Sequence, residues 1–278
     1  MSAEERSLRS LAVVRVSGAD AESFLQGQLT SDLGQLDSQT QLAACTTPQG
    51  RVIAVLRLCR REDGIYVLLP AALGASLVER LRKFVLRSKV AIELLDAWSV
   101  TGVDAGTGHS PDSRQRSGSG SVVFCYPDGR IAIARTGASC TLDAVADEAW
   151  QRADIAAGLP QIFSATSGHF VPQMLNLDLL DAVSFTKGCY TGQEIIARTQ
   201  HLGRIKRRTL RYAIRADEAP APLTPLHLEA TKVGEVLIGA RVEGGTEILA
   251  VISLEARDRP LRTATGHTAV PLPLPYAV

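Results

Sequence analysis

The chain has 278 residues, of which 45% are hydrophobic and 21% are charged, and its formal net charge at pH 7 is +1. This composition is typical of a soluble globular protein with one large domain or two to three small ones, and the near-neutral charge argues against a dedicated nucleic-acid binder. No run of 18 apolar residues occurs, so no membrane-spanning helix is expected, and the polar start Met1–Arg6 does not resemble a signal peptide.

The sequence pattern of the N-terminal half predicts strands and helices in mixed order, with hairpins between some of the strands. Strands are expected at 11–16, 41–45, 51–60, 65–69, 89–95, 97–103, 122–125 and 130–134, and helices after Ser17 or Asp20, at 71–87 and at 142–157. Residues 104–120 are rich in Gly, Ser and Asp and are expected to form a loop. This order predicts an α+β fold with largely antiparallel sheets.

The C-terminal part predicts a small all-β domain. Arginine and lysine alternate with apolar residues over 204–215, and a proline-rich break follows at 219–225. The segments 233–242 and 247–254 read as a hairpin. Together these strands indicate a barrel. The basic segment is either a solvated strand face or a seat for a polyanion such as a carboxylate tail or RNA phosphate.

The five cysteines, Cys45, Cys59, Cys125, Cys140 and Cys189, form no CxxC pair, and their number is odd. Reduced thiols in a cytoplasmic protein fit this pattern better than a disulfide framework. The spacing also fails the usual zinc and cluster motifs. Cys45, Cys59 and Cys125 lie in apparent strands, where a cysteine usually acts as a small buried apolar residue.

The central stretch is Lys187-Gly-Cys-Tyr-Thr-Gly-Gln-Glu194, between an expected strand at 182–185 and an expected helix from 195. Thr191 and Glu194 have the spacing of a capping box, which makes Thr191 the predicted N-cap. Cys189 would then lie near the positive end of a helix dipole and close to Lys187, and both features favour the thiolate. A buried structural cysteine beside a tight turn remains the alternative.

Two other polar features are open to two interpretations. The segment 26–32, Gln-Gly-Gln-Leu-Thr-Ser-Asp, either lines a polar pocket at a helix end or forms a solvated surface. His169 is flanked by Phe170 and followed by a proline. As a lone histidine it fits a structural or surface role better than a catalytic one.

The central stretch resembles the signature K-G-C-Y-x-G-Q-E of the YgfZ folate-binding family, relatives of the glycine-cleavage T-protein (aminomethyltransferase). All eight positions of this signature match, seven of them with a specified residue and Thr191 at the variable one. The segments Phe24–Asp32 and Lys83–Val90 resemble the family elements FLQGQLTND and KFxLRxKV, and the resemblance covers roughly residues 8–100 and 150–212.

This resemblance implies a T-protein-like ring of two intertwined α+β units with mostly antiparallel sheets (1–206), plus a small C-terminal β-barrel (207–278). It implies a cytoplasmic, monomeric protein that binds tetrahydrofolate or a one-carbon derivative. Its partners would be iron–sulfur client proteins such as tRNA-thiolating enzymes, with nucleic acid a secondary possibility. Cys189 would be the reacting residue and Lys187 its companion.

For the folate site, the resemblance places Asp154 where the T-protein has a carboxylate that pairs with the pterin ring. Phe24 and Tyr190 are candidates for packing against the ring, with core packing the alternative for Phe24. Gln193 and Glu194 of the signature are further candidates for cofactor contacts. Arg198, Arg204 or Arg207 would bind the glutamate tail of the folate.

Two other functions stay open. A folate-dependent aminomethyl transferase needs an acid that acts on the folate nitrogen, and the corresponding stretch 49–55 here contains none. A tRNA-binding accessory module would use the basic residues 204–215, although the near-neutral net charge disfavours this as the sole function.

Overall fold

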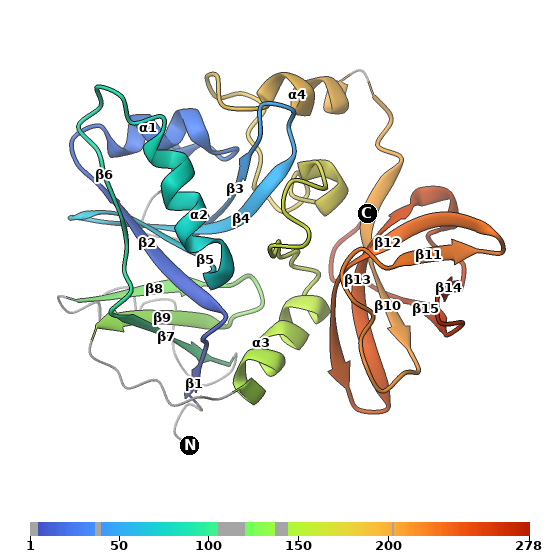
Figure 1. The fold of residues 1–278 in the computed structure, drawn as a ribbon. Coiled ribbons are helices and arrows are strands. Elements are labelled where there is room, and N and C mark those ends of the chain that lie inside the picture. Colours follow the sequence, from blue (N-terminus) through green and yellow to red (C-terminus); the bar gives the residue numbers. More distant parts are fainter. Residues whose placement is uncertain (1–4, 37–39, 105–119, 137–143, 202) are drawn as a thin grey trace. The chain divides into compact units, whose positions relative to one another are not determined.

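A computed structural model of the chain describes residues 5–36, 40–104, 120–136, 144–201 and 203–278. The chain divides into two compact units (Figure 1). Unit 1 comprises Met1–Thr46, Ala54–Asp147 and Asp181–Thr191, and unit 2 comprises Thr47–Ile53, Glu148–Leu180 and Gly192–Val278. The loop expected at 104–120 lies almost wholly outside the described residues.

Unit 1 contains two antiparallel sheets. The first has the strand order β3-β4-β5-β2-β6, and the second has the order β1-β7-β9-β8. The strands are β1 (Glu5–Ser7), β2 (Leu11–Ser17), β3 (Gln41–Thr46), β4 (Val52–Arg61), β5 (Gly64–Pro70), β6 (Ala91–Leu94), β7 (Trp98–Val103), β8 (Ser121–Cys125) and β9 (Ile131–Thr136). The predicted hairpins β4–β5 and β8–β9 are confirmed.

Two helices pack on the five-stranded sheet of unit 1. Helix α1 (Ala21–Gln28) contacts β5, and α2 (Ala71–Arg82) contacts β2, β5 and β6. Each buries one apolar face, with Leu25 of α1 and Leu77 of α2 almost fully buried. Helix α2 ends five residues earlier than the sequence predicts. A short 3-10 turn, η1 (Leu33–Gln35), follows α1.

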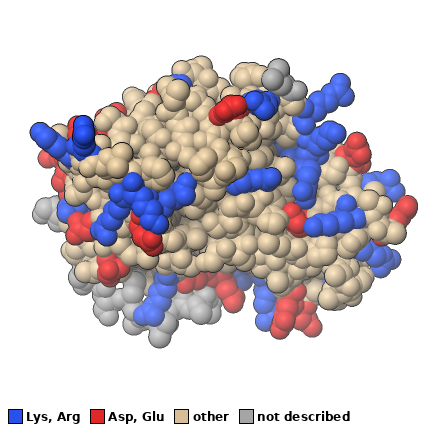
Figure 2. Space-filling model, turned by 45° about the horizontal axis from the view of Figure 1, so that its top comes forward, with Lys and Arg blue, Asp and Glu red and all other residues tan. Residues whose placement is uncertain are grey.

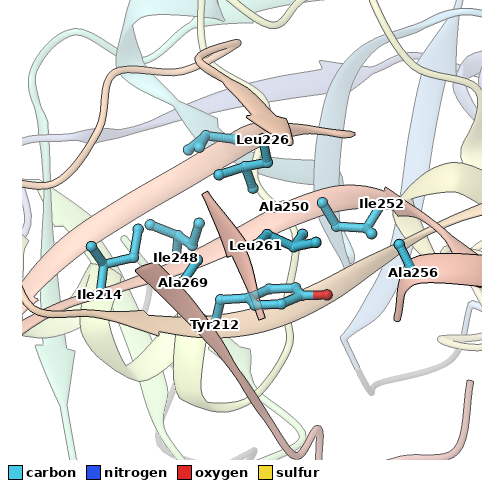
Figure 3. Close-up of a cluster of buried hydrophobic side chains, with 10 residues drawn as sticks. Tyr212, Ile214, Leu226, Ile248, Ala250, Ile252, Ala256, Leu261 and Ala269 are labelled. Carbon is cyan, nitrogen blue, oxygen red and sulfur yellow. The ribbon is translucent and has the colours of Figure 1, made fainter. Parts of the chain in front are cut away.

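Unit 2 contains a closed six-stranded barrel with the order β10-β13-β12-β11-β14-β15. Its strands are β10 (Arg207–Ile214), β11 (Pro225–Leu228), β12 (Thr231–Val242), β13 (Gly245–Ser253), β14 (Leu261–Thr263) and β15 (Thr268–Leu272), with the 3-10 turn η4 (Leu254–Ala256) after β13. Alternate side chains point inward and fill the barrel, among them Tyr212, Leu226 and Ile248 (Figure 3). The predicted C-terminal barrel is therefore confirmed.

The remaining elements are α3 (Ala144–Ala156), the 3-10 turn η3 (Pro172–Leu175) and α4 (Gln193–His201). Apart from β3–β4, every pair of neighbouring strands in the described residues of both units is antiparallel. The α+β class predicted from the sequence is confirmed. The division at residues 206 and 207 stays a prediction.

Candidate functional site

The signature segment lies in unit 1, in a loop that is fastened to the end of α1. Residues 182–185 do not form the expected strand. Instead, the Thr30 hydroxyl donates to the Ala182 carbonyl (2.6 Å), and the Ser184 amide donates to the Thr30 carbonyl (2.8 Å). The Thr191 amide donates to the Gly27 carbonyl (3.1 Å). These hydrogen bonds to Thr30 and Gly27 hold the segment in an irregular conformation, in place of the strand pairing that the apolar residues 182–185 predict.

The Lys187 ammonium makes the densest set of contacts in this loop. Its Nζ donates to three backbone carbonyls, those of Gln26 (2.6 Å), Leu29 (2.8 Å) and Ser31 (2.7 Å). An ammonium has three N–H donors, so all of them are used. Burial lowers the pKa of Lys187 to about 8, and the nearby carboxylate of Asp32 opposes this shift. The group is therefore mostly protonated at neutral pH.

The three carbonyls come from the place where α1 ends. The last carbonyls of a helix have no partner within it, and they form the negative end of its dipole. Leu29 is the C-cap of α1. The following turn is braced by Gln26, whose side chain donates to Asp32 (2.8 Å) and accepts from the Leu33 amide (2.7 Å). Lys187 thus caps α1 from a distant part of the sequence.

Cys189 is exposed, two residues after this clamp. The neighbouring Tyr190 is buried, with its ring centroid 4.9 Å from the Lys187 Nζ, and burial raises the pKa of its phenol to about 12. The phenol is therefore neutral at physiological pH and acts as an apolar and cation–π support for the clamp. Packing and the Lys187 bonds hold both ends of the short segment that presents the thiol.

The other described cysteines lie in different surroundings. Cys45 and Cys59 are buried, and burial raises the pKa of both thiols, that of Cys45 to about 11. Cys125 is partly buried, and Cys140 lies outside the described residues. Within the described chain, Cys189 is the exposed cysteine. The alternative of a buried structural cysteine at position 189 is thereby excluded.

Helix α4 begins at Gln193, one residue later than the capping-box prediction requires. The Ile196 amide donates to the Gly192 carbonyl, which makes Gly192 rather than Thr191 the N-cap. Gly192 has a positive φ of 84°, a conformation that glycine adopts without strain. The Glu194 carboxylate accepts instead from Arg198 (2.9 Å), one turn further along the helix.

No family model matches the chain. A curated relative, the tRNA-modifying protein YgfZ of Enterobacter sp. (strain 638), is 32% identical over 98% of this chain and 93% of the relative. The chain belongs to the YgfZ family. A second relative, an uncharacterized protein of Haemophilus influenzae, is 35% identical and covers 76% of this chain and 74% of its own.

A solved structure supports the same fold. The crystal structure of glycine cleavage system aminomethyltransferase T from Bartonella henselae aligns with a TM-score of 0.76 at 13% identity, covering 96% of this chain and 84% of that one. The predicted T-protein-like architecture of this YgfZ-family chain is therefore confirmed. At such low identity the likeness concerns the fold alone.

The remaining predicted site residues fall into both units. Phe24 lies on α1 in unit 1 and is buried, so it shares an element with the Lys187 clamp. Gln193, Glu194 and Arg198 lie on α4 in unit 2. Asp154 lies on α3 in unit 2 and is 4% exposed. The structure thus groups Lys187, Cys189 and Tyr190 in one loop. It places Phe24 on α1, Asp154 on α3, and Gln193, Glu194 and Arg198 together on α4.

The basic segment of this YgfZ-family chain is largely paired with carboxylates inside unit 2. Arg207 contacts Glu235 (3.4 Å), Arg208 forms two bonds with Asp178 (2.5 and 2.8 Å), and Arg211 contacts Glu247 (2.6 Å); Arg208 is buried. On the face of the molecule drawn in Figure 2, lysine and arginine side chains form several separate groups, with acidic side chains among them. Arg204 and Lys206 remain exposed.

Sequence reasoning missed the carbonyls that receive Lys187. The one hint in the sequence is the polar segment 26–32, which is interpreted as either the lining of a polar pocket or a solvated surface. The structure makes it neither: Thr30 and Ser31 are buried, and the segment supplies all three of the carbonyls and the hydroxyl that anchors Ala182. The described residues contain no cluster of three metal-ligating side chains and no helix able to cross a membrane.

Proposed function

We propose that this chain binds tetrahydrofolate or a one-carbon derivative, and that it acts in the assembly or repair of iron–sulfur proteins, including tRNA-modifying enzymes, through the thiol of Cys189. The observation that carries the proposal is an exposed thiol on a loop that a partly buried lysine clamps in place. The relative named as a tRNA-modifying protein supports the tRNA-related context. The T-protein-like fold supports folate binding.

In this proposal Lys187 positions the thiol. Its three N–H groups all point to carbonyls, so it can exchange a proton with a substrate only by breaking one of these bonds. Its action on Cys189 is therefore mechanical: it fixes the backbone two residues before the sulfur. A conformation fixed in this way reduces the entropy lost when the thiol meets its reaction partner.

The residues of unit 2 fit a pterin in their chemistry. A pterin ring presents several N–H donors, which need acceptors in a buried site. Asp154 supplies a buried carboxylate. Gln161 is 5% exposed, and its Oε1 is buried without a hydrogen-bond partner in the described structure. We propose that both accept from the pterin.

The glutamate tail of a folate needs a cation. Arg198 and Arg207 are paired with Glu194 and Glu235, whereas Arg204 is exposed and makes no ion pair in the part of the chain described. Arg204 is therefore the strongest of the three candidates for the tail. Tetrahydrofolate would supply the one-carbon carrier, while the protein binds and orients it.

One thiolate is too few ligands to hold an iron–sulfur cluster, which is usually bound by four. A cluster that passes Cys189 must therefore keep ligands from the client protein or from a small thiol. We therefore propose that Cys189 takes part in one step of cluster transfer or repair, and that the client protein retains the cluster.

The test combines a binding measurement with complementation. Tetrahydrofolate at about 100 times its dissociation constant should stabilise the wild type by about 2.7 kcal/mol, seen as a higher melting temperature. Cys189→Ser should keep the fold and this shift, but should fail to restore growth or tRNA thiolation in cells lacking the protein. Cys125→Ser, at a partly buried position, is the matched control and should restore both. Full rescue by Cys189→Ser would contradict the role of the thiol.

The T-protein-like fold also keeps open the aminomethyl transferase alternative. The segment 49–55 contains no acid that could assist at the folate nitrogen, which disfavours it. Turnover of methylene-tetrahydrofolate with an aminomethyl donor would favour it over the proposed role. The tRNA-binding alternative is weakened because Arg207, Arg208 and Arg211 already pair with carboxylates.

A further inference from the structure

The segment Arg82–Lys89, here called the α2–β6 loop, carries an exposed apolar surface in unit 1. Leu86 is 90% exposed and Phe84 is 41% exposed. In the described chain the other exposed large hydrophobic residues are Leu179 and Val270, at 41% and 50%. Two of four such residues therefore lie within three positions of each other, and Leu86 is by far the most exposed.

The α2–β6 loop is held in one shape despite an unfavourable backbone. Leu86 has a φ of 35°, a left-handed conformation that residues with a side chain rarely adopt. The turn around it is closed by a bond from the Ser88 amide to the Val85 carbonyl (2.8 Å). The Lys89 amide donates to the Asp20 carboxylate (2.7 Å). Strain maintained by the surroundings at an exposed apolar residue points to a binding role.

A cavity of about 580 Å³ adjoins this loop, between α2 and β6. Its apolar lining consists of Ala75, Val78 and Leu94, and its acidic lining consists of Glu79, Glu93 and Asp96. Arg82 and Lys83 belong both to the cavity and to the loop. The α2–β6 loop, which is apolar and carries cations, thus lies beside a cavity that is apolar and carries carboxylates, both in unit 1.

We infer that the α2–β6 loop of one copy docks into the α2–β6 cavity of a second copy. Leu86 enters the apolar hollow, where it loses contact with water. Arg87 and Lys89 are exposed and make no ion pair in the described chain, and they meet the carboxylates of the cavity. Asp96 also makes no described ion pair, whereas Glu79 and Glu93 already pair with Lys83 and Arg15. The contact between Arg87 and Asp96 is therefore the central one.

The arrangement closes as a two-fold dimer. Because the loop and the cavity are neighbours on one surface, a two-fold axis beside them brings both loops into both cavities at once, and no site remains to extend a chain of copies. The interface is small, so the dimer is weak and exchanges with the monomer. This departs from the monomer expected from the sequence.

A second copy fits better than a nucleic acid. Leu86, the most exposed residue, has no flat face on which a base can stack. The ring of Phe84 already has the Arg80 guanidinium 5.8 Å from its centroid. The cavity with the complementary charge lies on the chain itself, so the simplest occupant is another copy of the same chain.

Sedimentation equilibrium of the full chain, from micromolar to millimolar concentration, tests the inference. The wild type should show a monomer–dimer equilibrium with no larger species. Leu86→Ser should raise the dissociation constant by about tenfold or more, since a buried Leu side chain is lost from each half of the interface. Val270→Ser, at another exposed apolar position, should leave it unchanged. A monomeric wild type throughout, or assembly beyond the dimer, would overturn the proposal.

A charge exchange tests which surfaces meet. Arg87→Glu and Asp96→Arg should each weaken the dimer, and the double variant should restore it, because the pair is rebuilt with its charges reversed. Both positions are exposed, so thermal unfolding should report intact folds. Additive losses in the double variant would show that the loop and the cavity do not meet, and would overturn the proposed docking even if the protein dimerises.

Discussion

The clamp around Lys187 permits a quantitative prediction. Methionine at this position keeps a similar length but donates no hydrogen bond, so Lys187→Met leaves three carbonyls that lay 2.6–2.8 Å from Nζ without their partner. A hydrogen bond to a charged group contributes about 1.5–3 kcal/mol. The three bonds share one ammonium, and water can reach part of the site. We therefore expect a total loss of about 2–3 kcal/mol rather than the full sum.

Thermal unfolding followed by circular dichroism measures this loss. For a chain of this size, about 2–3 kcal/mol corresponds to a decrease in melting temperature of about 4–12 °C. Mass spectrometry of the peptide containing Cys189 gives a second readout, because release of the loop should change the rate at which iodoacetamide modifies the thiol. The control is Lys83→Met, which removes an exposed pair with Glu79 and should leave the melting temperature close to that of the wild type.

The reasoning would be refuted if the Lys187→Met protein has the same melting temperature as the wild type and its Cys189 reacts at the wild-type rate. That result would mean that the three carbonyls bind water equally well and that packing alone holds the loop. A lower melting temperature with an unchanged Cys189 rate would keep the structural role of Lys187 but would remove its link to the thiol.

Three further predictions concern pH and the barrel. Between pH 8 and 10.5 the unfolded chain keeps a proton that folded Lys187 has released, so the free energy of unfolding in urea should rise by about 1–2 kcal/mol over this window, allowing for partial exposure; an equal rise in Lys187→Met would contradict this origin. Gly234→Ala should lower barrel stability by about 1–3 kcal/mol, because a Cβ there would lie 2.5 Å from the Val251 carbonyl oxygen; an unchanged urea midpoint would disprove the close contact. Asp178→Ala should cost about 3–5 kcal/mol by leaving Arg208 buried without its carboxylate, a loss that urea titration would detect and that a neutral outcome would refute.

The barrel and the hairpins could be predicted because their information is local. Alternating apolar residues over 207–214 and a short turn at 243–245 define neighbouring strands within a few residues of each other. The contacts of the same residues were harder to foresee. The sequence around Arg208 suggests a solvated strand face, yet the side chain is buried and paired with Asp178. This partner lies 30 residues earlier, so the local pattern could not reveal it.

The errors in the predicted elements have local causes. Residues 182–185 are apolar enough for a strand, but four residues give a weak alternation signal, and bonds to Thr30 fix a different conformation. The helix expected at 71–87 ends at Arg82 because Phe84–Ser88 form turns, with Leu86 in a left-handed conformation. Helical propensity alone does not reveal such a turn.

The contacts of the candidate site could be predicted only in part. The sequence singled out Cys189 and Lys187 as candidates, but it gave Lys187 only an electrostatic effect on the thiol. Its real contacts are three carbonyls located 156–161 residues earlier, and backbone carbonyls leave no mark in a sequence. The polar side chains of segment 26–32 marked it as a candidate pocket, but they did not show that its backbone binds Lys187.

The late position of the signature loop in the chain affects how the protein is made. Helix α1 is translated long before Lys187, and at ribosomal rates of about 5–20 residues per second the gap of at least 156 residues takes roughly ten to thirty seconds. During that time the emerging polypeptide has an α1 end that no lysine caps. Cys189 can take up its final position only after nearly all of unit 1 has left the ribosome. The Cys189 thiol is thus among the last parts of this unit to mature during synthesis.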